Sequence, residues 1–491
     1  MRQILVLIIF LPIIFSCRKS QNEASSPPQE TKLSGEELSK IHCASCHKYP
    51  DPAQLPTEFW VSSVLPNMSY RLGVGDYFGE LMSKSSDESN LILENGIYQT
   101  SPLLHQKDWE KIVEFYKNNS PKEFPKIPSK IVTELTAFKV QNIDYKGNEI
   151  IMSQFDPVQN SIFISEAVSK DLFELKSSEK KSLNPGNKFP IVDFDNHSKY
   201  GKVWLEIGNM NPNDLKQGKL RTANKVLLDS LKRPVDLLLA DMNGDKTDDF
   251  VISSFGNHLG SLSWYDGLNF TKHPLLELPG ARVSYFIDLD HDGLKDVLAL
   301  MTQARESIVF FKNKGKGEFE MQNLLEFLPN YGSSYFEMAD IDLDNDLDII
   351  YTNGDNADLS ITLKPYHGLR IFVNDGKNNF TEKYFYPQNG ASKVLARDFD
   401  MDGDLDLASI SYFPDHTKSE SFLFFENKGN IKFEVKTLSY FSKIKILTLD
   451  AGDFDKDGDL DIVLGGFDRS LEANSRKSKN VFVLLNKKIK R

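Results

Sequence analysis

Two cysteines and a histidine occur together near the start of the chain, at a spacing that suits covalent attachment of a porphyrin. They are Cys43, Cys46 and His47, in the pattern C-x-x-C-H. Two thiols three positions apart can add to the vinyl groups on one edge of a porphyrin, and the adjacent imidazole can ligate its iron. The motif therefore predicts one covalently bound haem c.

Two other uses of these residues agree less well with the sequence. A structural zinc ion would need a second pair of ligands at similar spacing, but the one remaining cysteine is Cys17. A redox dithiol of the thioredoxin kind would sit in a βαβ context, which this stretch lacks. Haem attachment is the better interpretation of the motif.

The second axial ligand of the iron is predicted to be Met68, two residues after Pro66. A thioether on the distal side would raise the reduction potential relative to a second histidine. Met82 and His105 are alternative ligands, and an open sixth position is a further alternative.

An aspartate-rich motif recurs five times in the second half of the chain, and its copies start 47, 52, 58 and 55 residues apart. Positions 1, 3, 5 and 9 of each copy offer side-chain oxygen, and residue 7 can add its backbone carbonyl. Ligands that are all oxygen favour calcium over a transition metal, and magnesium demands a tighter octahedron. We therefore expect up to five calcium ions, bound by Asp241, Asn243, Asp245, Asp249, Asp288, Asp290, Asp292, Asp296, Asp340, Asp342, Asp344, Asp348, Asp398, Asp400, Asp402, Asp406, Asp453, Asp455, Asp457 and Asp461.

The residues around each copy predict strands rather than the helices of an EF-hand. Position 12, where an EF-hand has a bidentate glutamate, is Ile252 in the first copy. Short apolar runs precede and follow the loop, such as Leu237–Ala240 and Phe250–Ile252. A further strand and a turn come later in each unit, as at Ile308–Gly315. About four strands in each unit of roughly fifty residues are typical of a β-propeller blade.

These units resemble the FG-GAP or VCBS-type repeats of integrin-like β-propellers. Ser254–Asn257 and Gly465–Phe467 stand where the phenylalanine–glycine elements of that family fall. The resemblance implies an all-β propeller of seven blades over residues 130–491, with calcium in the loop between the first two strands of several blades.

Two of the seven blades would lack the acidic loop. From chain length and strand-like sequence we expect them near residues 130–180 and 181–235. Asp193 and Asp195 are interpreted as the remnant of a lost loop in the second of these blades.

Helix signals flank the C-x-x-C-H motif. Ser34 and Glu37 form a capping box just before it. Beyond it, Asp108 is the predicted N-cap of a helix, whose apolar face comprises Trp109, Ile112, Val113 and Tyr116. The layout resembles class I cytochrome c, where an N-terminal and a C-terminal helix pack together beside the haem. The resemblance implies a small all-α cytochrome c domain over residues 33–125.

The N-terminus has the features of an export signal. Arg2 precedes the apolar run Ile4–Phe15, which ends just before Cys17. This resembles the lipobox of bacterial lipoproteins, which implies removal of residues 1–16 and a lipid anchor on Cys17. An ordinary secretory signal is the alternative. Residues 17–32, rich in Ser, Pro, Gln and Glu, are expected to form a flexible tether.

These features predict a multidomain electron-transfer protein of the bacterial cell envelope, anchored to a membrane by lipid and facing the periplasm or the exterior. A net charge of −12 argues against nucleic acid as a partner. The expected partner is a redox protein, and the propeller could also dock a protein or glycan. A haem-coupled, dehydrogenase-like oxidoreductase with its substrate site on the propeller is one alternative. An adhesion or scaffold protein with a redox-sensing haem is the other. No catalytic constellation is evident in the sequence, so a carrier is favoured over an enzyme.

Overall fold

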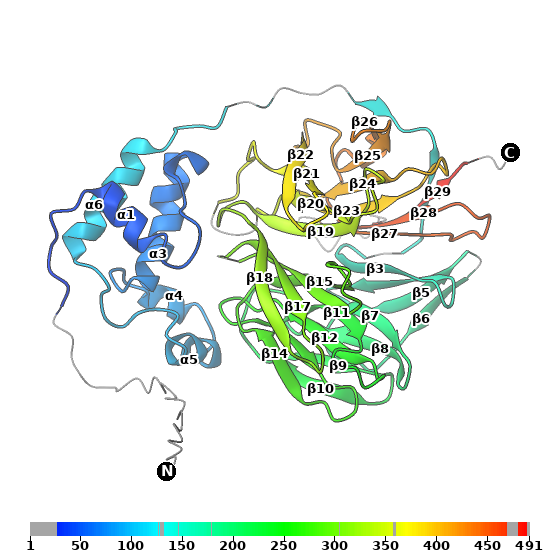
Figure 1. The fold of residues 1–491 in the computed structure, drawn as a ribbon, viewed down its shortest axis with the longest axis horizontal. Helices are drawn as coiled ribbons and strands as arrows, with labels where there is room; N and C mark the ends of the chain where they lie inside the picture. Colours follow the sequence, from blue (N-terminus) through cyan, green and yellow to red (C-terminus); the bar gives the residue numbers. More distant parts are fainter. Residues whose placement is uncertain are drawn as a thin grey trace, which may run out of the picture.

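The computed structural model describes residues 27–125, 127, 132–145, 147–177, 179–303, 305–356, 360–468 and 480–488. A helical part comes first in the chain, and a β-propeller follows it (Figure 1). The predicted signal peptide and the predicted lipidation residue Cys17 lie outside the described residues. Every helix that the structure describes is too short or too polar to cross a membrane.

The helical part contains short helices that enclose a small apolar core. Its α-helices are α1 (Gly35–His42), α2 (Thr57–Phe59), α3 (Leu65–Arg71), α4 (Phe78–Met82), α5 (Ser86–Glu94) and α6 (Gln106–Asn119), with a 3₁₀ turn at Pro52–Gln54 and a π turn at Trp60–Val64. Helix α1 packs against α6, and the core between them includes Leu38, Trp60, Ile112 and Tyr116. A glycine is required at Gly35, because a Cβ there would lie 2.1 Å from the backbone oxygen of Lys111.

The start of α1 agrees with the sequence, whereas the start of α6 does not. The capping box is confirmed, since Ser34 Oγ accepts from the Glu37 N–H at 3.3 Å and Glu37 Oε2 accepts from the Ser34 N–H at 2.8 Å. The cap predicted at Asp108 is wrong. His105 caps α6 instead, with its Nδ1 accepting from the Lys107 N–H, and Asp108 is buried inside the first turn.

The last residues of the predicted tether are held against α6. The Thr31 N–H donates to a carboxylate oxygen of Asp108 at 2.9 Å, and Lys111 Nζ donates to the Thr31 carbonyl at 2.7 Å. Glu30 forms ion pairs with Lys107 and Lys111. Glu30 and Thr31, near the end of the predicted tether, are thus in contact with α6.

The propeller has seven blades, as predicted (Figure 1). Each blade is a sheet whose consecutive strands run antiparallel. Blade 1 contains β3 (Ile150–Asp156), β4 (Ser161–Glu166), β5 (Leu172–Lys176) and β6 (Glu179–Leu183); blade 2 contains β7 (Ile191–His197), β8 (Gly201–Glu206), β9 (Gly218–Arg221) and β10 (Val226–Leu231); blade 3 contains β11 (Pro234–Ala240), β12 (Asp249–Ser254), β13 (Ser261–Tyr265) and β14 (Lys272–Leu276); blade 4 contains β15 (Ala281–Ile287), β16 (Asp296–Met301), β17 (Ser307–Asn313) and β18 (Phe319–Glu326). Blade 5 contains β19 (Ser333–Ala339), β20 (Asp348–Asn353), β21 (Gly368–Asn374) and β22 (Phe380–Pro387); blade 6 contains β23 (Ala391–Arg397), β24 (Asp406–Ser411), β25 (Phe422–Asn427) and β26 (Phe433–Thr437); blade 7 contains β27 (Ile446–Gly452), β28 (Asp461–Gly466) and β29 (Val481–Asn486).

The ring is closed by a segment that the sequence assigned to the first blade. Strand β2 (Phe138–Asn142) pairs antiparallel with β29 and completes blade 7, and the two-residue strand β1 (Thr133–Glu134) pairs parallel with β26 of blade 6. The first blade therefore begins at Ile150 and not near residue 130. The reason is that a propeller removes its open edges by pairing the two ends of the ring.

Neighbouring blades are joined around the axis by acidic side chains of the innermost strands. Asp193 Oδ2 accepts from the Leu237 N–H, and Asp236 Oδ2 accepts from the N–H and hydroxyl of Ser284. Asp450 Oδ2 accepts from the Phe155 N–H in the same way across the closure. The prediction of a remnant metal loop at Asp193 is wrong, because this residue lies within strand β7 and links two blades.

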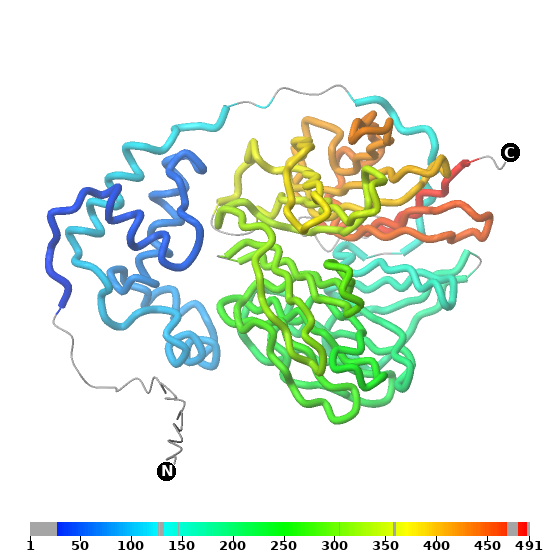
Figure 2. The backbone as a smooth tube through the Cα atoms, viewed as in Figure 1, coloured from blue at the N-terminus to red at the C-terminus, as the bar shows by residue number. Residues whose placement is uncertain are grey.

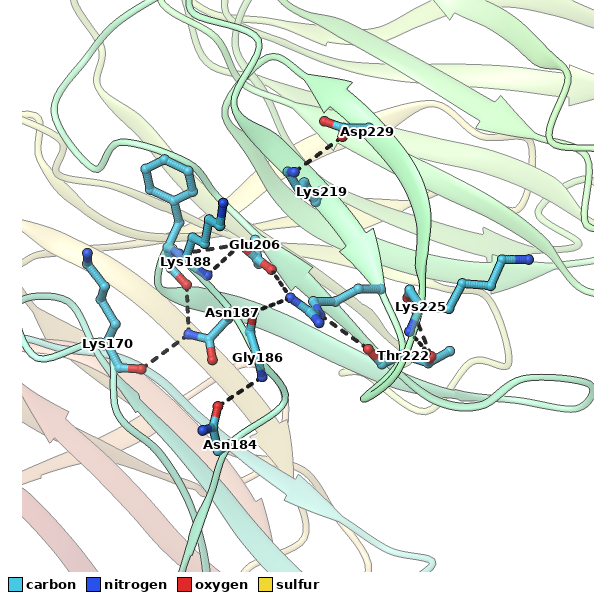
Figure 3. Close-up of polar contacts among 12 residues, drawn as sticks. Lys170, Asn184, Gly186, Asn187, Lys188, Glu206, Lys219, Thr222, Lys225 and Asp229 are labelled. Atoms are coloured by element: carbon cyan, nitrogen blue, oxygen red, sulfur yellow. Dashed lines mark hydrogen bonds and ion pairs between the residues drawn. The ribbon is translucent and has the colours of Figure 1, made fainter.

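Blades 1 and 2 lack the aspartate loop. In blade 2 a buried ion pair between Glu206, at the end of β8, and Arg221, at the end of β9, holds the segment that precedes the blade (Figure 3). Glu206 is fully buried and accepts from Arg221 at 3.0 Å and from the backbone N–H groups of Lys188 and Phe189. Arg221 also donates to the Gly186 carbonyl. These bonds satisfy the carboxylate without a metal ion.

Candidate functional site

The C-x-x-C-H segment begins where α1 ends, with Cys43 as the C-cap of that helix. Cys43 and Cys46 form no disulfide. The Cys43 side chain packs against the core of the helical part, and burial raises the pKa of its thiol to about 11. Cys46 is exposed. Both thiols are thus available for another covalent use.

The His47 ring is oriented by one hydrogen bond. Its Nδ1 lies 2.9 Å from the carbonyl oxygen of Lys48, and because a carbonyl can only accept, Nδ1 carries the proton. Burial is the main cause that lowers the pKa of His47, and the cations Arg71 and Arg305 lower it further. The ring is therefore held neutral with Nε2 as its unprotonated nitrogen, the state in which histidine ligates a metal.

The three candidate axial ligands have different surroundings. Met68 is half-buried and packs against the same apolar core as Cys43. Met82 is 69% exposed on α4. His105 uses its Nδ1 to cap α6. Among these residues, the structure brings Met68 into the core that the C-x-x-C-H segment borders.

The C-x-x-C-H segment and the residues that follow it form hydrogen bonds with the propeller. Arg305 Nε donates to the Cys46 carbonyl at 2.8 Å, and Lys48 Nζ donates to the Glu326 carbonyl at 3.1 Å. Nearby, the Tyr366 hydroxyl donates to the Gln54 carbonyl at 3.0 Å. The helical part thus lies against loops of blades 4 and 5 (Figure 2).

A second group of contacts centres on His258. An Arg71 guanidinium nitrogen lies 3.1 Å from His258 Nδ1, and Tyr98 packs edge-on against the imidazole. The buried Asp214 accepts from the backbone N–H groups of Asn257, His258 and Leu259 and so holds this loop in place. Burial, and then Arg71, lower the pKa of His258 to about 4, so the imidazole is neutral and accepts from the arginine.

These contacts and the aspartate loops lie on opposite faces of the propeller. Arg305, His258 and Tyr366 belong to connections between the second and third strands of their blades, whereas each aspartate loop joins the first and second strands. Successive strands of a blade run antiparallel, so the two kinds of connection leave the sheet at opposite ends. The C-x-x-C-H segment is therefore remote from the aspartate loops.

All five aspartate loops share one backbone conformation, as their common spacing predicts. The position-1 carboxylate accepts from the N–H groups of residues 5 and 6, as Asp288 does from Asp292 and Gly293. Positions 4 and 6 have positive φ, as at His291 (57°) and Gly293 (88°). This curls the chain around its own side-chain oxygens.

Position 9 has a structural role that the sequence did not reveal. Each of these aspartates is the first residue of its second strand, is buried, and accepts from a backbone N–H at the end of the third strand or, for Asp249, just beyond it. In four of the five loops it also accepts from the N–H of position 2. In the exception, Asp406, one buried oxygen has no hydrogen-bond partner in the described part of the chain.

Four of the loops bring three carboxylates close enough to hold one cation. Their ligand atoms lie within 4.8 Å of one another in the groups Asp288–Asp290–Asp296, Asp340–Asp342–Asp344, Asp398–Asp400–Asp402 and Asp453–Asp455–Asp461. The fifth loop, 241–249, has Asn243 at position 3 and no such triplet is found in it.

Position 7 adds carboxylates that were not among the predicted ligands. It is Asp346, Asp404 and Asp459 in the last three loops. Asp404 Oδ1 and both oxygens of Asp459 are buried without a hydrogen-bond partner among the described residues. The signal was present in the strict alternation of aspartate through these three loops, but the backbone carbonyl was the expected ligand at this position.

Comparisons with known proteins support the repeat. Residues 288–351, which include two of the aspartate loops, match the family described as FG-GAP-like repeat. No curated protein matches the chain significantly. Among solved structures, the crystal structure of the N-terminal domain of Nup159 is similar at 11% identity and a TM-score of 0.39, over 72% of this chain and 97% of that one.

Proposed function

We propose that this protein is a cell-envelope electron carrier, in which the helical part is a cytochrome c domain with one covalent haem and the propeller is its rigid docking platform. The observation that favours this most is the state of His47. Its Nδ1–H is engaged by the Lys48 carbonyl and its Nε2 is unprotonated, directly after two thiols that form no disulfide.

The residues present fit a haem in their donor chemistry. Cys43 and Cys46 would form the thioether bonds, and His47 Nε2 and Met68 would ligate the iron. The bound haem would supply reversible one-electron oxidation and reduction of its iron. The Lys48 carbonyl keeps the His47 ring in a fixed tautomer. Arg71 and Arg305 bring positive charge near that ring, which favours the reduced iron.

The propeller restrains this domain through its contacts on one face. Arg305, Tyr366 and the Asp214-anchored His258 loop come from different blades, so several fixed points hold the helical part. A redox protein of the envelope would then exchange electrons with a haem whose orientation is set by the propeller. We further propose that Cys17 is lipidated and anchors the protein to a bacterial membrane.

The aspartate loops are proposed to bind calcium as structural ions. Asp404, Asp406 and Asp459 have buried carboxylate oxygens with no hydrogen-bond partner among the described residues, which is costly unless a cation balances them. Oxygen-only donors suit a hard divalent ion. Calcium-bound carboxylates are poor bases, so these loops are not proposed to be catalytic.

The test is expression of the full chain in a bacterial strain with c-type cytochrome maturation, followed by a pyridine haemochrome spectrum and intact-mass measurement. We expect one covalent haem in the wild type and none in the variant with both Cys43→Ser and Cys46→Ser. Asn67→Ser, beside the proposed distal ligand, is a matched control that should keep the haem. Wild-type protein that stays colourless with both thiols free would rule out the proposal.

A further inference from the structure

The five aspartate loops share one fold but differ in what neutralises their negative charge. In blade 4, Lys312 Nζ bonds to Asp290 and lies 3.0 Å from Asp292, so an ammonium group lies among the loop carboxylates. In blade 5, His291 Nε2 lies 3.9 Å from Asp346. Lys312 thus balances part of the charge of the blade 4 loop.

The last three loops are more acidic than the first two, because each of them has aspartate at every odd position from 1 to 9. In blade 6, Lys488 Nζ lies 3.9 Å from Asp400. In blade 7, no carboxylate of loop 453–461 forms an ion pair with a lysine, arginine or histidine among the residues that the structure describes, although Lys456 belongs to the loop.

Asp459 is the most unusual member of the blade 7 loop. The residue is 3% exposed, and neither carboxylate oxygen has a hydrogen-bond partner among the described residues. It stands at position 7 of the loop, between Asp457 and Asp461 in the alternating run of aspartates. A buried, unpartnered carboxylate beside three others is unfavourable unless a cation lies between them.

The blade 7 loop is also joined to the strand pair that closes the ring. Asp461 Oδ1 accepts from the Asn486 N–H at 2.9 Å, and Asn486 lies opposite Phe138 in the pairing of β29 with β2. The Asn486 side chain donates to the carbonyls of Phe399 and Leu460. The loop, its neighbour in blade 6 and the closing strands therefore form one connected network.

We propose that loop 453–461 is the tightest divalent-cation site of the propeller, with the Asp459 carboxylate as a ligand, and that the cation fastens the closure of the ring. The proposal rests on the proposed calcium binding and ranks the loops within it. The blade 4 loop is the weakest of the four clustered sites, because its ammonium group competes with the ion.

The test compares Asp459→Asn with Asp346→Asn, which changes the same loop position in blade 5. The full mature chain is stripped with chelator and titrated with calcium chloride by calorimetry. We expect Asp459→Asn to weaken the tightest site about tenfold or more, equivalent to about 1.4 kcal/mol, and Asp346→Asn to leave it within about twofold. Equal effects of the two variants would overturn the ranking, whereas no calcium binding by the wild type would overturn the proposed calcium sites themselves.

Two further readouts separate ligation from a general loss of structure. Without calcium, Asp459→Asn should have a higher melting temperature than the wild type, because it removes a buried repulsive charge. When calcium is added, its melting temperature should rise less than that of the wild type. Hydrogen exchange should show that chelation of the wild type exposes amides of residues 138–142 and 481–486 before those of blade 4. If the amides of the closing strands β2 and β29 stay as protected from exchange as those of blade 4 in chelator, the link between the cation and ring closure is contradicted.

Discussion

Arg305 and Cys46 are joined by a 2.8 Å hydrogen bond from the arginine Nε to the cysteine carbonyl. The bond connects a loop of blade 4 to the centre of the C-x-x-C-H segment. It places a cationic side chain of the propeller beside His47, whose pKa it helps to lower. The propeller thus contributes to the electrostatic environment of the proposed haem site.

Replacement of Arg305 by methionine should lower the reduction potential of the haem. The positive charge favours the reduced iron, so its loss favours the oxidised form. A redox titration of the purified holo-protein measures the shift. Lys314→Met removes a cation of the same blade that pairs with Glu320 on the surface, and it should leave the potential unchanged. Equal potentials in all three proteins would show that Arg305 does not act on the iron.

Removal of calcium should lower the melting temperature without altering the haem spectrum. The aspartate loops lie on the face opposite the C-x-x-C-H segment, so the proposed ions would stabilise blade ends far from the proposed haem site. Thermal melts by circular dichroism and visible spectra, with and without chelator, check both halves of the prediction. A melt that is unchanged in excess chelator would argue against structural calcium.

The buried ion pair of Arg221 with Glu206 should contribute far more to the free energy of unfolding than the exposed pair of Lys219 with Asp229 in the same blade (Figure 3). Arg221→Met leaves the buried Glu206 carboxylate without its cation and should cost about 3–5 kcal/mol. Lys219→Met breaks the more exposed pair with Asp229 and should cost at most about 1 kcal/mol. Denaturant unfolding followed by tryptophan fluorescence compares the two. Similar losses would mean that burial does not set the strength of this pair.

The closeness of α1 and α6 can be tested at one glycine. Gly35→Ala would place a Cβ 2.1 Å from the Lys111 backbone oxygen and should destabilise the helical part by about 1–3 kcal/mol or more. Gly79→Ala, on α4, meets no atom within 4 Å and should be neutral or stabilise by about 1 kcal/mol. Hydrogen exchange of the helices compares the two variants. Equal protection of the helix amides in both variants would disprove the close crossing of α1 and α6.

A buried carboxyl at the propeller axis should make stability depend on pH. Burial raises the pKa of Asp236 from 3.8 to about 6 despite hydrogen bonds from Ser284 and Ser253, and Asp193 and Lys393 are the charged groups that interact with it. Between about pH 4 and 6 the folded state therefore holds a proton that the unfolded state has released, so the contribution of Asp236 to stability falls as pH rises.

The matching experiment measures melting temperature from pH 4 to 7 in saturating calcium, which keeps the loop aspartates ionised. Asp236→Asn should show a shallower decline than the wild type over this range. Asp229→Asn, on the surface of blade 2, is the control and should follow the wild type. Identical slopes for all three proteins would assign the pH dependence to other groups.

Local patterns in the sequence were enough to predict much of this architecture. The capping box at Ser34 and Glu37, the strands around each aspartate loop and the number of blades depend on residues close together in the chain or on a regular repeat. The cap of α6 was misassigned to Asp108 because His105 can supply the same kind of acceptor three residues earlier. Caps and repeats of this kind depend on residues close together in the chain, so they can be recognised without knowledge of the fold.

Other features required the tertiary structure, because they join residues that only the closed ring brings together. Sequence spacing could not show that residues 138–142 complete blade 7, since the pairing partner is at the other end of the chain. Nor could it show that Asp459 is buried without a hydrogen-bond partner in the described part of the chain, while Lys312 balances part of the charge of the blade 4 loop. The motifs indicate which residues could bind an ion. The burial of each carboxylate and the charges around it depend on how the blades pack, and this packing determines which carboxylates need an ion.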